Sequence, residues 1–471
     1  MDELLLGKRE GRRWGLLLEE LKKVSSVAVP FMAVAVSQYL LQAVSVMMAG
    51  HLGQLSLSAV AVATSFCNVT GFSLLSGFAG AMETLCGQAY GAKQYQKFGS
   101  YTYCAIMCLI PICLPVCLLW LFMDKLLVLT GQDPEIAKVA WRYGIWLIPA
   151  LFPCSILQSQ VRYFQTQSLI LPMLFVSLAT LCFHVPVCWV LVFKSGLENT
   201  GAALSIGLSY WLNVILLGFY MRYSASCEKT RCFILKDVFS SVKHFFRFGI
   251  PSAVMLCLEW WSFEILILLS GLLPDAELQT SVISICFTSS SLHYYIPFGI
   301  SVAASTRVSN ELGGGNPEAA QISTIVVMLV TLTEAVIASV SLFCCGHIFG
   351  YAYSGDKEVV NNVAKMVPLM CLSIIMDSLH VVLAGIVRGI GWQHIGAYAN
   401  LGAYYLVGIP MGVLGAFVLH WRGEGLWLGM LGGSTVQGIL LALVSIFTNW
   451  KNQAIMARER MLDGTHVHGS F

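Results

Sequence analysis

Charged residues are scarce in this chain of 471 residues: Lys, Arg, Asp and Glu make up 11%, against 57% for hydrophobic residues. Ordinary soluble domains carry roughly 25% charged residues. Long stretches lack charged side chains altogether. The longest, residues 24–82, has room for two membrane spans, because one span needs about 20 residues. This scarcity excludes an ordinary soluble protein and predicts an all-α integral membrane protein.

The motifs of several other protein classes are also missing. The 16 cysteines are scattered through apolar stretches, without a C-x-x-C pair or a Cys/His cluster of zinc spacing, so we expect free thiols and no metal site. The 10 histidines are dispersed and no Walker-type phosphate loop occurs, which argues against an enzyme. No filter motif or ring of pore charges indicates a channel. We therefore expect no catalytic residues, no cofactor and no nucleic-acid partner.

The spacing of charge predicts twelve transmembrane helices. Their approximate limits are 24–50, 57–82, 98–123, 143–161, 168–193, 200–221, 248–271, 279–303, 319–346, 366–386, 396–419 and 425–450. With this count, most of the Lys and Arg residues lie on the side of the two termini. Because basic residues concentrate in cytoplasmic segments, we expect the N- and C-termini to be cytoplasmic.

The two terminal segments are predicted to be cytoplasmic tails, residues 1–23 and 451–471. In the first, Leu and Trp residues are mixed with Lys and Arg, so it forms either an amphipathic helix on the inner membrane face or a disordered tail. We expect no cleavable signal peptide, because no short apolar stretch with a small-residue cleavage site precedes the first span.

The chain repeats itself. Pro30 aligns with Pro251, and further matches continue in the same order to the last helix of each half, including Thr84 with Thr306. Collinear matches of this kind indicate duplication. They predict two parallel six-helix halves, residues 24–221 and 248–450. The basic segment 222–247 would join them as a cytoplasmic linker facing anionic membrane lipid.

Three motifs resemble those of one family. Residues 82–92 read Met-Glu-Thr-Leu-Cys-Gly-Gln-Ala-Tyr-Gly-Ala, residues 305–316 read Ser-Thr-Arg-Val-Ser-Asn-Glu-Leu-Gly-Gly-Gly-Asn, and residues 257–264 read Cys-Leu-Glu-Trp-Trp-Ser-Phe-Glu. The chain resembles, over nearly its whole length, the MATE (multidrug and toxic compound extrusion) transporters, most closely their plant, DETOXIFICATION-like branch. Major-facilitator transporters also have two six-helix halves, but the D-R-x-G-R-R type of loop is absent from residues 90–98.

The resemblance implies the MATE fold and a secondary active transporter. It would export organic solutes (xenobiotics, secondary metabolites or organic cations) by proton antiport with alternating access. A lipid- or polysaccharide-precursor flippase of related architecture is the alternative. We expect a monomer in the plasma membrane or the vacuolar membrane, since both have an acidic far side; the natural substrate stays open.

Five acids fall within the predicted spans, and acids in hydrocarbon are functional candidates by default. Glu264 and Asp377 lie deepest, both in the second half. A desolvated carboxyl favours its protonated form, so this pair is predicted to couple transport to protons. The resemblance implies the same pair, and the alternative is a static hydrogen bond that locks helix packing. The secondary acids are Glu259 as a rim or inter-helix hydrogen-bond group, Glu83 as a brace of the cytoplasmic loop, and Glu334 as a packing group.

The choice between protons and sodium rests on Ser45. Bacterial MATE proteins of the sodium-linked type commonly have an Asp at this place in the first helix, before a Met-Ala-Gly turn, so Ser45 favours protons. Pro30 and Pro251 are candidate bending hinges. The candidates for lining the solute cavity are Gln38, Gln42, Asn68, Trp260, Trp261 and Tyr294, although the two Trp side chains equally well fill helix interfaces.

Overall fold

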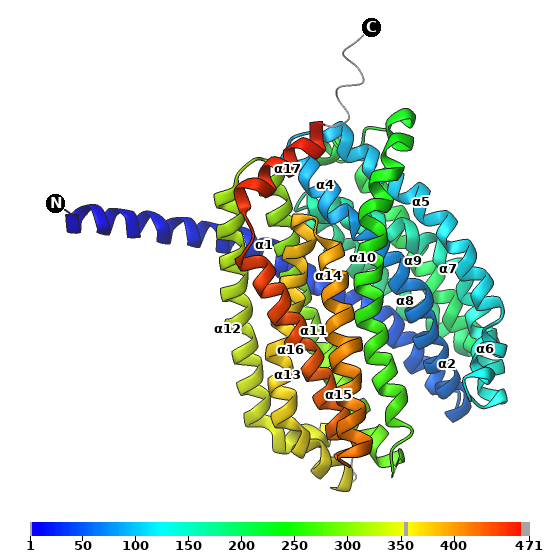
Figure 1. The fold of residues 1–471 in the computed structure, drawn as a ribbon. Helices are drawn as coiled ribbons and strands as arrows, with labels where there is room; N and C mark the ends of the chain where they lie inside the picture. The colour runs from blue at the N-terminus through cyan, green and yellow to red at the C-terminus, as the bar shows by residue number, and fades with distance from the viewer. Residues whose placement is uncertain (1, 275, 353–356, 463–471) are drawn as a thin grey trace. The chain divides into compact units, whose positions relative to one another are not determined.

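The computed structural model describes residues 2–274, 276–352 and 357–462, with the side chains of 2–13, 276, 277, 280, 347, 349 and 352 left out. These residues are almost entirely helical and include no strand (Figure 1). Residues 463–471, the end of the predicted C-terminal tail, lie outside the described residues.

The first six spans are helices, two of them with π-helical parts. They are α1 (Asp2–Gly50); α2 (Gln54–Cys67) continued by η1 (Asn68–Phe72), α3 (Ser73–Ala79) and α4 (Ala81–Gly91); α5 (Tyr95–Leu121); α7 (Pro134–Thr166); α8 (Ile170–Trp189) with η2 (Val190–Lys194); and α9 (Glu198–Tyr223). The short helix α6 (Met123–Leu129) lies between α5 and α7.

The second six spans follow the turn η3 (Ala225–Cys227). They are α10 (Leu235–Ser270); α11 (Ala276–Gly313); α12 (Pro317–Phe349), followed by η4 (Gly350–Ala352); α13 (Lys357–Ile390); α14 (Gln393–Asn400) continued by η5 (Leu401–Gly408), α15 (Ile409–Val413) and η6 (Leu414–Val418); and α16 (Arg422–Ile446). A last helix, α17 (Trp450–Leu462), ends the described chain.

Each predicted span corresponds to one of these twelve long helical segments. Eleven of them are long and apolar enough to cross a membrane within the described residues. The twelfth, α11, contains the predicted span 279–303 and has 38 residues, which is ample length. Its many Ser and Thr residues lower its hydropathy below that of the others.

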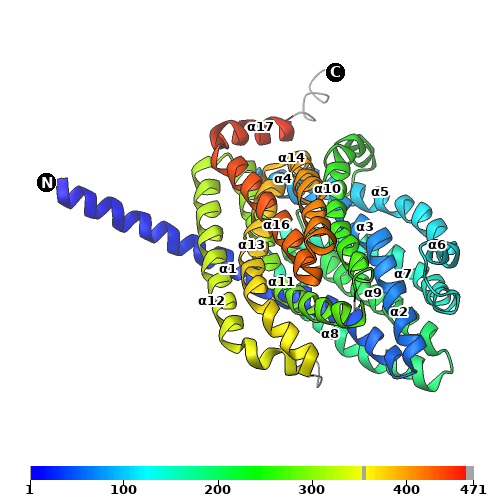
Figure 2. The same ribbon diagram turned by 60° about the horizontal axis from the view of Figure 1, so that its bottom comes forward.

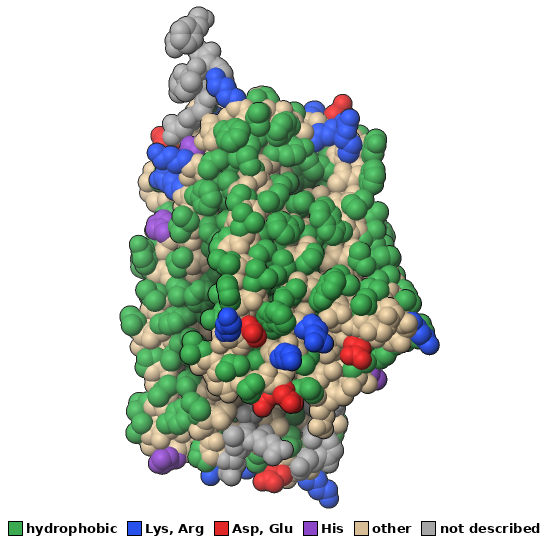
Figure 3. Space-filling model, turned by 90° about the vertical axis from the view of Figure 1, so that its right-hand side faces the viewer, with side chains coloured by type: hydrophobic (Ala, Val, Ile, Leu, Met, Phe, Trp, Pro, Cys, Tyr) green, Lys and Arg blue, Asp and Glu red, His purple; other side chains and the backbone are tan. Residues whose placement is uncertain are grey.

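The surface of the helices confirms an integral membrane protein. Large apolar side chains such as Leu114, Phe175 and Phe343 are mostly exposed. Figure 3 shows a face covered by hydrophobic side chains, with charged ones gathered towards its two ends. Such an apolar surface suits contact with lipid. The helices also satisfy their own backbone hydrogen bonds, which lipid cannot do. All 16 cysteines are free thiols, as predicted, and most of them are buried.

The helices form two compact units, residues 33–257 and residues 1–32 together with 258–471. The divisions lie inside α1 and α10 rather than in the predicted linker. Each unit therefore contains the first part of the leading helix of the other half of the sequence. In the second unit, α13 packs against both α11 and α12 (Figure 2).

In both units, a glycine permits close packing against the leading helix that comes from the other half of the sequence. A Cβ atom on Gly77 of α3 would lie 2.6 Å from the Cα atom of Ala253 in α10. A Cβ atom on Gly299 of α11 would lie 2.5 Å from the Cγ atom of Met32 in α1. The sequence repeat aligns Gly77 with Gly299 and Met32 with Ala253. One close contact thus occurs twice, as duplication requires.

The segments predicted as tails and linker contain more helix than expected. Residues 2–23 are helical and continuous with the first span, while their place on the inner membrane face stays a prediction. Helix α10 starts at Leu235, inside the predicted linker 222–247. Helix α17 was not predicted. It buries Ala454, Ala457 and Met461 along one side, which explains why a polar segment is helical.

Candidate functional site

A buried carboxylate lies at the centre of a hydrogen-bonded network in the second unit. Glu259 of α10 is 6% exposed, and its Oε2 atom accepts hydrogen bonds from Asn400 Nδ2 and Gln437 Nε2, both at 3.3 Å. Gln437 Nε2 also donates to Asn400 Oδ1 at 2.7 Å, while Gln437 Oε1 accepts from the hydroxyl of Tyr404 at 2.7 Å. The network joins α10 to α14, η5 and α16.

A second acid belongs to the same cluster. Asp377 Oδ1 lies 3.5 Å from Nε2 of His380, one turn later on α13. Electrostatic interactions connect Tyr294, Tyr404 and His380 to both Glu259 and Asp377. His380 is buried, and its Nδ1 atom has no hydrogen-bond partner among the described residues. We call Glu259, Asp377, His380, Tyr294, Tyr404, Asn400 and Gln437 the acidic cluster.

The structure therefore brings Asp377 together with Glu259 and Tyr294. Glu264, which the sequence ranked ahead of Glu259, is partly exposed. Five residues apart on a helix, Glu259 and Glu264 point about 140° away from each other. Glu264 follows Phe263, whose ring packs edge-on against the ring of Tyr404 in the cluster, with the ring centroids 5.6 Å apart. Trp260 and Trp261 are partly exposed at 39% and 40%.

Glu334 belongs to a separate group in this unit. Its Oε1 atom lies 2.7 Å from His293 Nε2, and its Oε2 atom accepts a hydrogen bond from Ser378 at 3.4 Å. These contacts join α12 to α11 and α13, and the packing role of Glu334 stays a prediction. A cavity of about 750 Å³ lies beside Glu334 and is lined mainly by apolar residues, among them Trp14 and Leu18 of α1.

Glu83 is paired in the first unit. Its Oε1 atom lies 3.1 Å from Arg162 Nε, with side chains 3% and 8% exposed respectively. The pair connects α4 to α7 within the motif of residues 82–92, which is helical in α4 up to Gly91 rather than the predicted loop. This geometry suits the bracing role predicted for Glu83, since two buried opposite charges hold both helices in register.

Ser45 takes the place of the sodium-linked Asp in α1. Ser45 Oγ lies 3.2 Å from His184 Nε2, and Ser209 Oγ lies 2.9 Å from His184 Nδ1. Among the described residues, no group of three or more His, Cys, Asp and Glu side chains is placed to hold a metal ion. Gln42 and Asn68, two predicted lining residues, exchange hydrogen bonds of 3.2 Å, whereas Gln38 is partly exposed.

Sequence reasoning missed several members of the acidic cluster. His380 could have been predicted from the sequence, because any ionisable residue inside a span, and not only an acid, is a functional candidate. Asn400, Tyr404 and Gln437 gave no signal, since neutral polar side chains are frequent in these helices. Asn400 and Tyr404 lie where α14 becomes the π-helical η5, and wide turns of this kind often occur at functional sites.

Comparison with known proteins decides the family. A family model described as MatE matches residues 30–190 and 251–414, more than half of the chain. The chain belongs to the MatE family. The two matches begin at Pro30 and Pro251, the residues aligned by the sequence repeat, which confirms the duplication.

Relatives of this MATE protein are found in plants. Protein DETOXIFICATION 3 of Arabidopsis thaliana is 54% identical over 461 residues, covering 98% of this chain and 97% of the relative. Protein DETOXIFICATION 8 of the same plant is 55% identical over 448 residues, with 95% and 92% coverage. The confirmed resemblance identifies a multi-pass membrane protein that exports organic compounds, from a family of transporters rather than enzymes.

Solved structures agree with this fold. The crystal structure of the eukaryotic MATE transporter AtDTX14 has a TM-score of 0.91 and 52% identity, covering 94% of this chain and 99% of that one. A transporter of the MOP superfamily from Pyrococcus furiosus has a TM-score of 0.81 at 14% identity, covering 91% and 95%. The second likeness shows the fold alone.

Proposed function

We propose that this MATE transporter exports organic solutes by proton antiport with alternating access, coupled by Glu264 and Asp377 together with Glu259. The observation that carries the proposal is the acidic cluster. It holds Glu259, hydrogen-bonded to Asn400 and Gln437, and a separate contact between Asp377 and His380, all in the second unit. Ionisable groups in spans are costly and mark proton relays in transporters.

Protonation of Glu259 would rearrange the network around it. The carboxylate now accepts from two amide groups, Asn400 and Gln437. A proton on Oε2 would turn this acceptor into an O–H donor with fewer lone pairs for the two amide donors. A turn of Gln437 in response would disturb its bond to Tyr404. Proton binding on α10 is thereby coupled to the packing of η5 and α16.

Asp377 and His380 supply a second titrating pair on α13. When His380 is protonated it compensates the charge of Asp377, and when it is neutral the carboxylate carries an uncompensated charge. The unpartnered Nδ1 atom of His380 is available to a proton or to a polar group of the solute. Glu264 adds a third carboxyl beside Phe263, the residue that contacts Tyr404.

The same groups suit organic cations. Aromatic faces and a carboxylate attract a cation more strongly where water is excluded. Tyr294 stacks on Phe298 with ring centroids 5.7 Å apart, so its ring is held in place. We propose Tyr294, Trp260 and Trp261 as solute contacts in one unit, and Gln38, Gln42 and Asn68 as polar contacts in the other.

Bending of the two leading helices would accompany transport. Pro30 lies inside α1 and Pro251 inside α10. A proline inside a helix removes one backbone hydrogen bond and permits a kink. The unit boundaries follow these prolines within two turns, at Met32 and Cys257.

We further propose cytoplasmic termini, a monomer, lipid contacts along the 222–247 segment, and a plasma or vacuolar membrane whose far side is acidic.

Transport in proteoliposomes tests the coupling. A fluorescent organic cation is loaded and its efflux is followed under an imposed pH gradient, for wild type and for Glu264→Gln, Asp377→Asn and Glu259→Gln. The expected result is at least a tenfold loss of gradient-driven efflux in each variant. The control is Glu424→Gln, an exposed acid on α16. If all three variants follow the gradient as wild type does, the coupling site is wrong. Movement of a fluorescent lipid in the same vesicles tests the flippase alternative.

A further inference from the structure

A second, basic cavity lies in the unit formed by residues 33–257, away from the acidic cluster. Its volume is about 470 Å³, and it lies among α5, α7 and α9 where α9 ends. Arg222, in the last turn of α9, and Arg231, in the segment joining α9 to α10, both line it. Among the described residues, no acidic side chain forms an ion pair with either arginine.

The position of Arg231 is set by the protein itself. Its Nη1 atom donates to the backbone carbonyl of Arg222, which caps the end of α9. The connecting segment is also anchored, since the hydroxyl groups of Thr230 and Tyr163 lie 2.6 Å apart. The guanidinium group of Arg231 is thus held at the cavity before any ligand arrives, and the side chain of Arg222 lines the same cavity. Paired guanidinium groups recognise phosphate because their fork of N–H donors matches its oxygens.

The inner wall of the cavity carries an unsatisfied acceptor. Gln160 of α7 is 6% exposed and lines the cavity. Its Nε2 atom donates to the carbonyl of Val214 at 3.1 Å, while its Oε1 atom has no hydrogen-bond partner among the described residues. A buried amide oxygen without a donor is costly, so the site favours a ligand with an O–H or N–H group beside its phosphate.

The rest of the site combines apolar side chains with the hydroxyl groups of Thr102 and Tyr103, as is typical of a membrane interface. Ile106 and Met221 line the cavity, and Phe219, Tyr223 and Phe233 are exposed nearby on α9 and the connecting segment. Aromatic side chains concentrate at the level of lipid headgroups. An acyl chain would lie along such a surface, whereas a fully soluble ligand would leave it uncovered.

We propose that this cavity binds the headgroup of an anionic phospholipid that also carries a hydroxyl or ammonium donor. The phosphate lies between Arg222 and Arg231, the donor reaches Gln160 Oε1, and an acyl chain follows Ile106 and Met221. Basic pockets between membrane helices are a known type of headgroup site. Occupation would join the end of α9 to the segment that leads into α10, and so stabilise the connection between the two halves of the sequence.

Binding is measured on the purified full-length protein in detergent, by native mass spectrometry and thermal unfolding. The added ligands are short-chain phosphatidylinositol, phosphatidylserine and phosphatidylcholine, and soluble inositol phosphate. Phosphatidylinositol and phosphatidylserine are expected to bind at least tenfold more tightly than phosphatidylcholine, which has no N–H or O–H donor. Equal binding of phosphatidylcholine, or of soluble inositol phosphate, would overturn the assignment to an anionic lipid.

Paired variants locate the site. Arg222→Gln/Arg231→Gln is expected to weaken phosphatidylinositol binding at least tenfold. Lys229→Gln/Lys236→Gln removes the same charge from the same connecting region outside the cavity, and should change binding less than twofold. Equal losses in both double variants would show general charge attraction and refute the site.

Gly218 offers a test that leaves the charge unchanged. A Cβ atom there would meet only Gln160 Nε2, at 3.6 Å, which is ordinary contact. Gly218→Ala should therefore fold and bind lipid, whereas Gly218→Leu should fill the cavity and abolish binding. Gln160→Met removes the acceptor and should narrow the preference for phosphatidylserine over phosphatidylcholine. Wild-type affinity in Gly218→Leu would contradict the proposal.

Discussion

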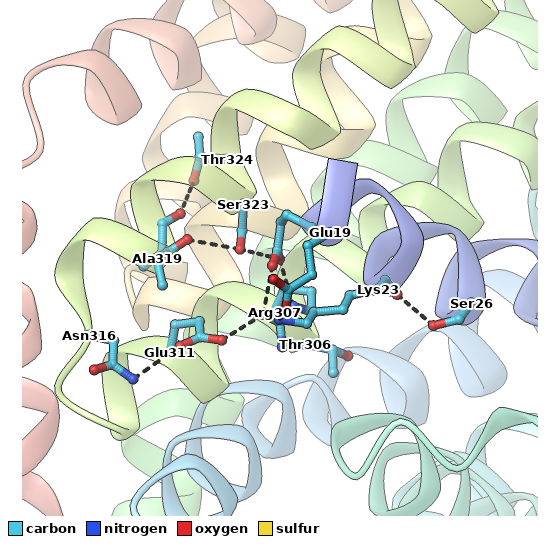
Figure 4. Close-up of polar contacts among 12 residues, drawn as sticks. Glu19, Lys23, Ser26, Thr306, Arg307, Glu311, Asn316, Ala319, Ser323 and Thr324 are labelled. Carbon is cyan, nitrogen blue, oxygen red and sulfur yellow. Dashed lines mark hydrogen bonds and ion pairs between the residues drawn. The ribbon is translucent and has the colours of Figure 1, made fainter. Parts of the chain in front are cut away.

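Glu20 in α1 forms a buried ion pair whose removal should cost measurable stability. Arg307 of α11 donates to both of its carboxylate oxygens, from Nε at 2.7 Å and Nη2 at 2.9 Å. The hydroxyl of Ser323 in α12 donates to Oε1 at 2.5 Å. The side chains of Glu20 and Arg307 are only 7% and 13% exposed. Figure 4 shows Arg307 with Glu311 and Ser323 close by, and a dashed line joins Arg307 to Glu311.

The cost of Glu20→Ala follows from what Arg307 retains. Removing one partner of a buried pair usually costs about 3–5 kcal/mol, because the other charge is left unpaired. Arg307 Nη2 keeps its 2.6 Å contact with Glu311, so we expect about 2–3 kcal/mol. Burial by itself would lower the pKa of Arg307, but the hydrogen bonds and charges of Glu20 and Glu311 raise it, and the guanidinium stays charged.

Thermal unfolding of the purified protein measures this loss. At about 2–4 °C per kcal/mol for a body of 150–250 residues, the Tm of Glu20→Ala should fall by roughly 5–10 °C. A double-mutant cycle with Arg307→Ala should show that the two losses are not additive. The control is Glu19→Ala, since Glu19 pairs with Lys23 on the exposed side of α1. Equal Tm values for Glu19→Ala and Glu20→Ala would refute the reasoning.

Further predictions use the same measurement. Gly429→Ala should lower Tm by the equivalent of about 1–3 kcal/mol, because its Cβ would lie 2.5 Å from the Cα atom of Gly412. The control is Gly402→Ala, which should lower Tm less because a Cβ atom there would meet no atom within 4 Å. Glu83→Gln removes the buried ion pair between Glu83 and Arg162 and should cost about 3–5 kcal/mol, whereas the double variant Glu83→Gln/Arg162→Gln should recover part of that loss. Adding a reductant should leave Tm unchanged, since all cysteines are free, and a shift would reveal a disulfide.

Several elements were predictable from local sequence because one strong physical term decides them. The predicted span 425–450 falls on α16 within a few residues, since hydrocarbon excludes charge and α16 carries its charged residues at its first turn. The early start of α10 at Leu235 was missed for the opposite reason. Outside the membrane, Lys and Asp are as compatible with a helix as with a loop, so the spacing of charge does not predict where a helix starts.

The candidate site was only partly predictable. Depth in a span identified Glu259, Glu264 and Asp377 as candidates, because any acid in hydrocarbon is costly. Which of these acids is most buried could not be predicted. Whether a side chain on α10 faces packed helices depends on the neighbours that surround it, and helical phase alone separates Glu259 from Glu264 without saying which faces inward.

The sequence by itself determined the membrane environment, the number of long spans, the duplication and the family, because charge spacing and repeated motifs are local and collinear features. Only the tertiary structure decided which groups meet. Glu259 receives its hydrogen bonds from residues 141 and 178 positions further along the chain, and Glu20 meets Arg307 at a separation of 287. Such contacts depend on helix packing, which no single segment specifies. The unequal chemistry of the two halves was visible in the sequence, but its assembly into one acidic cluster was not.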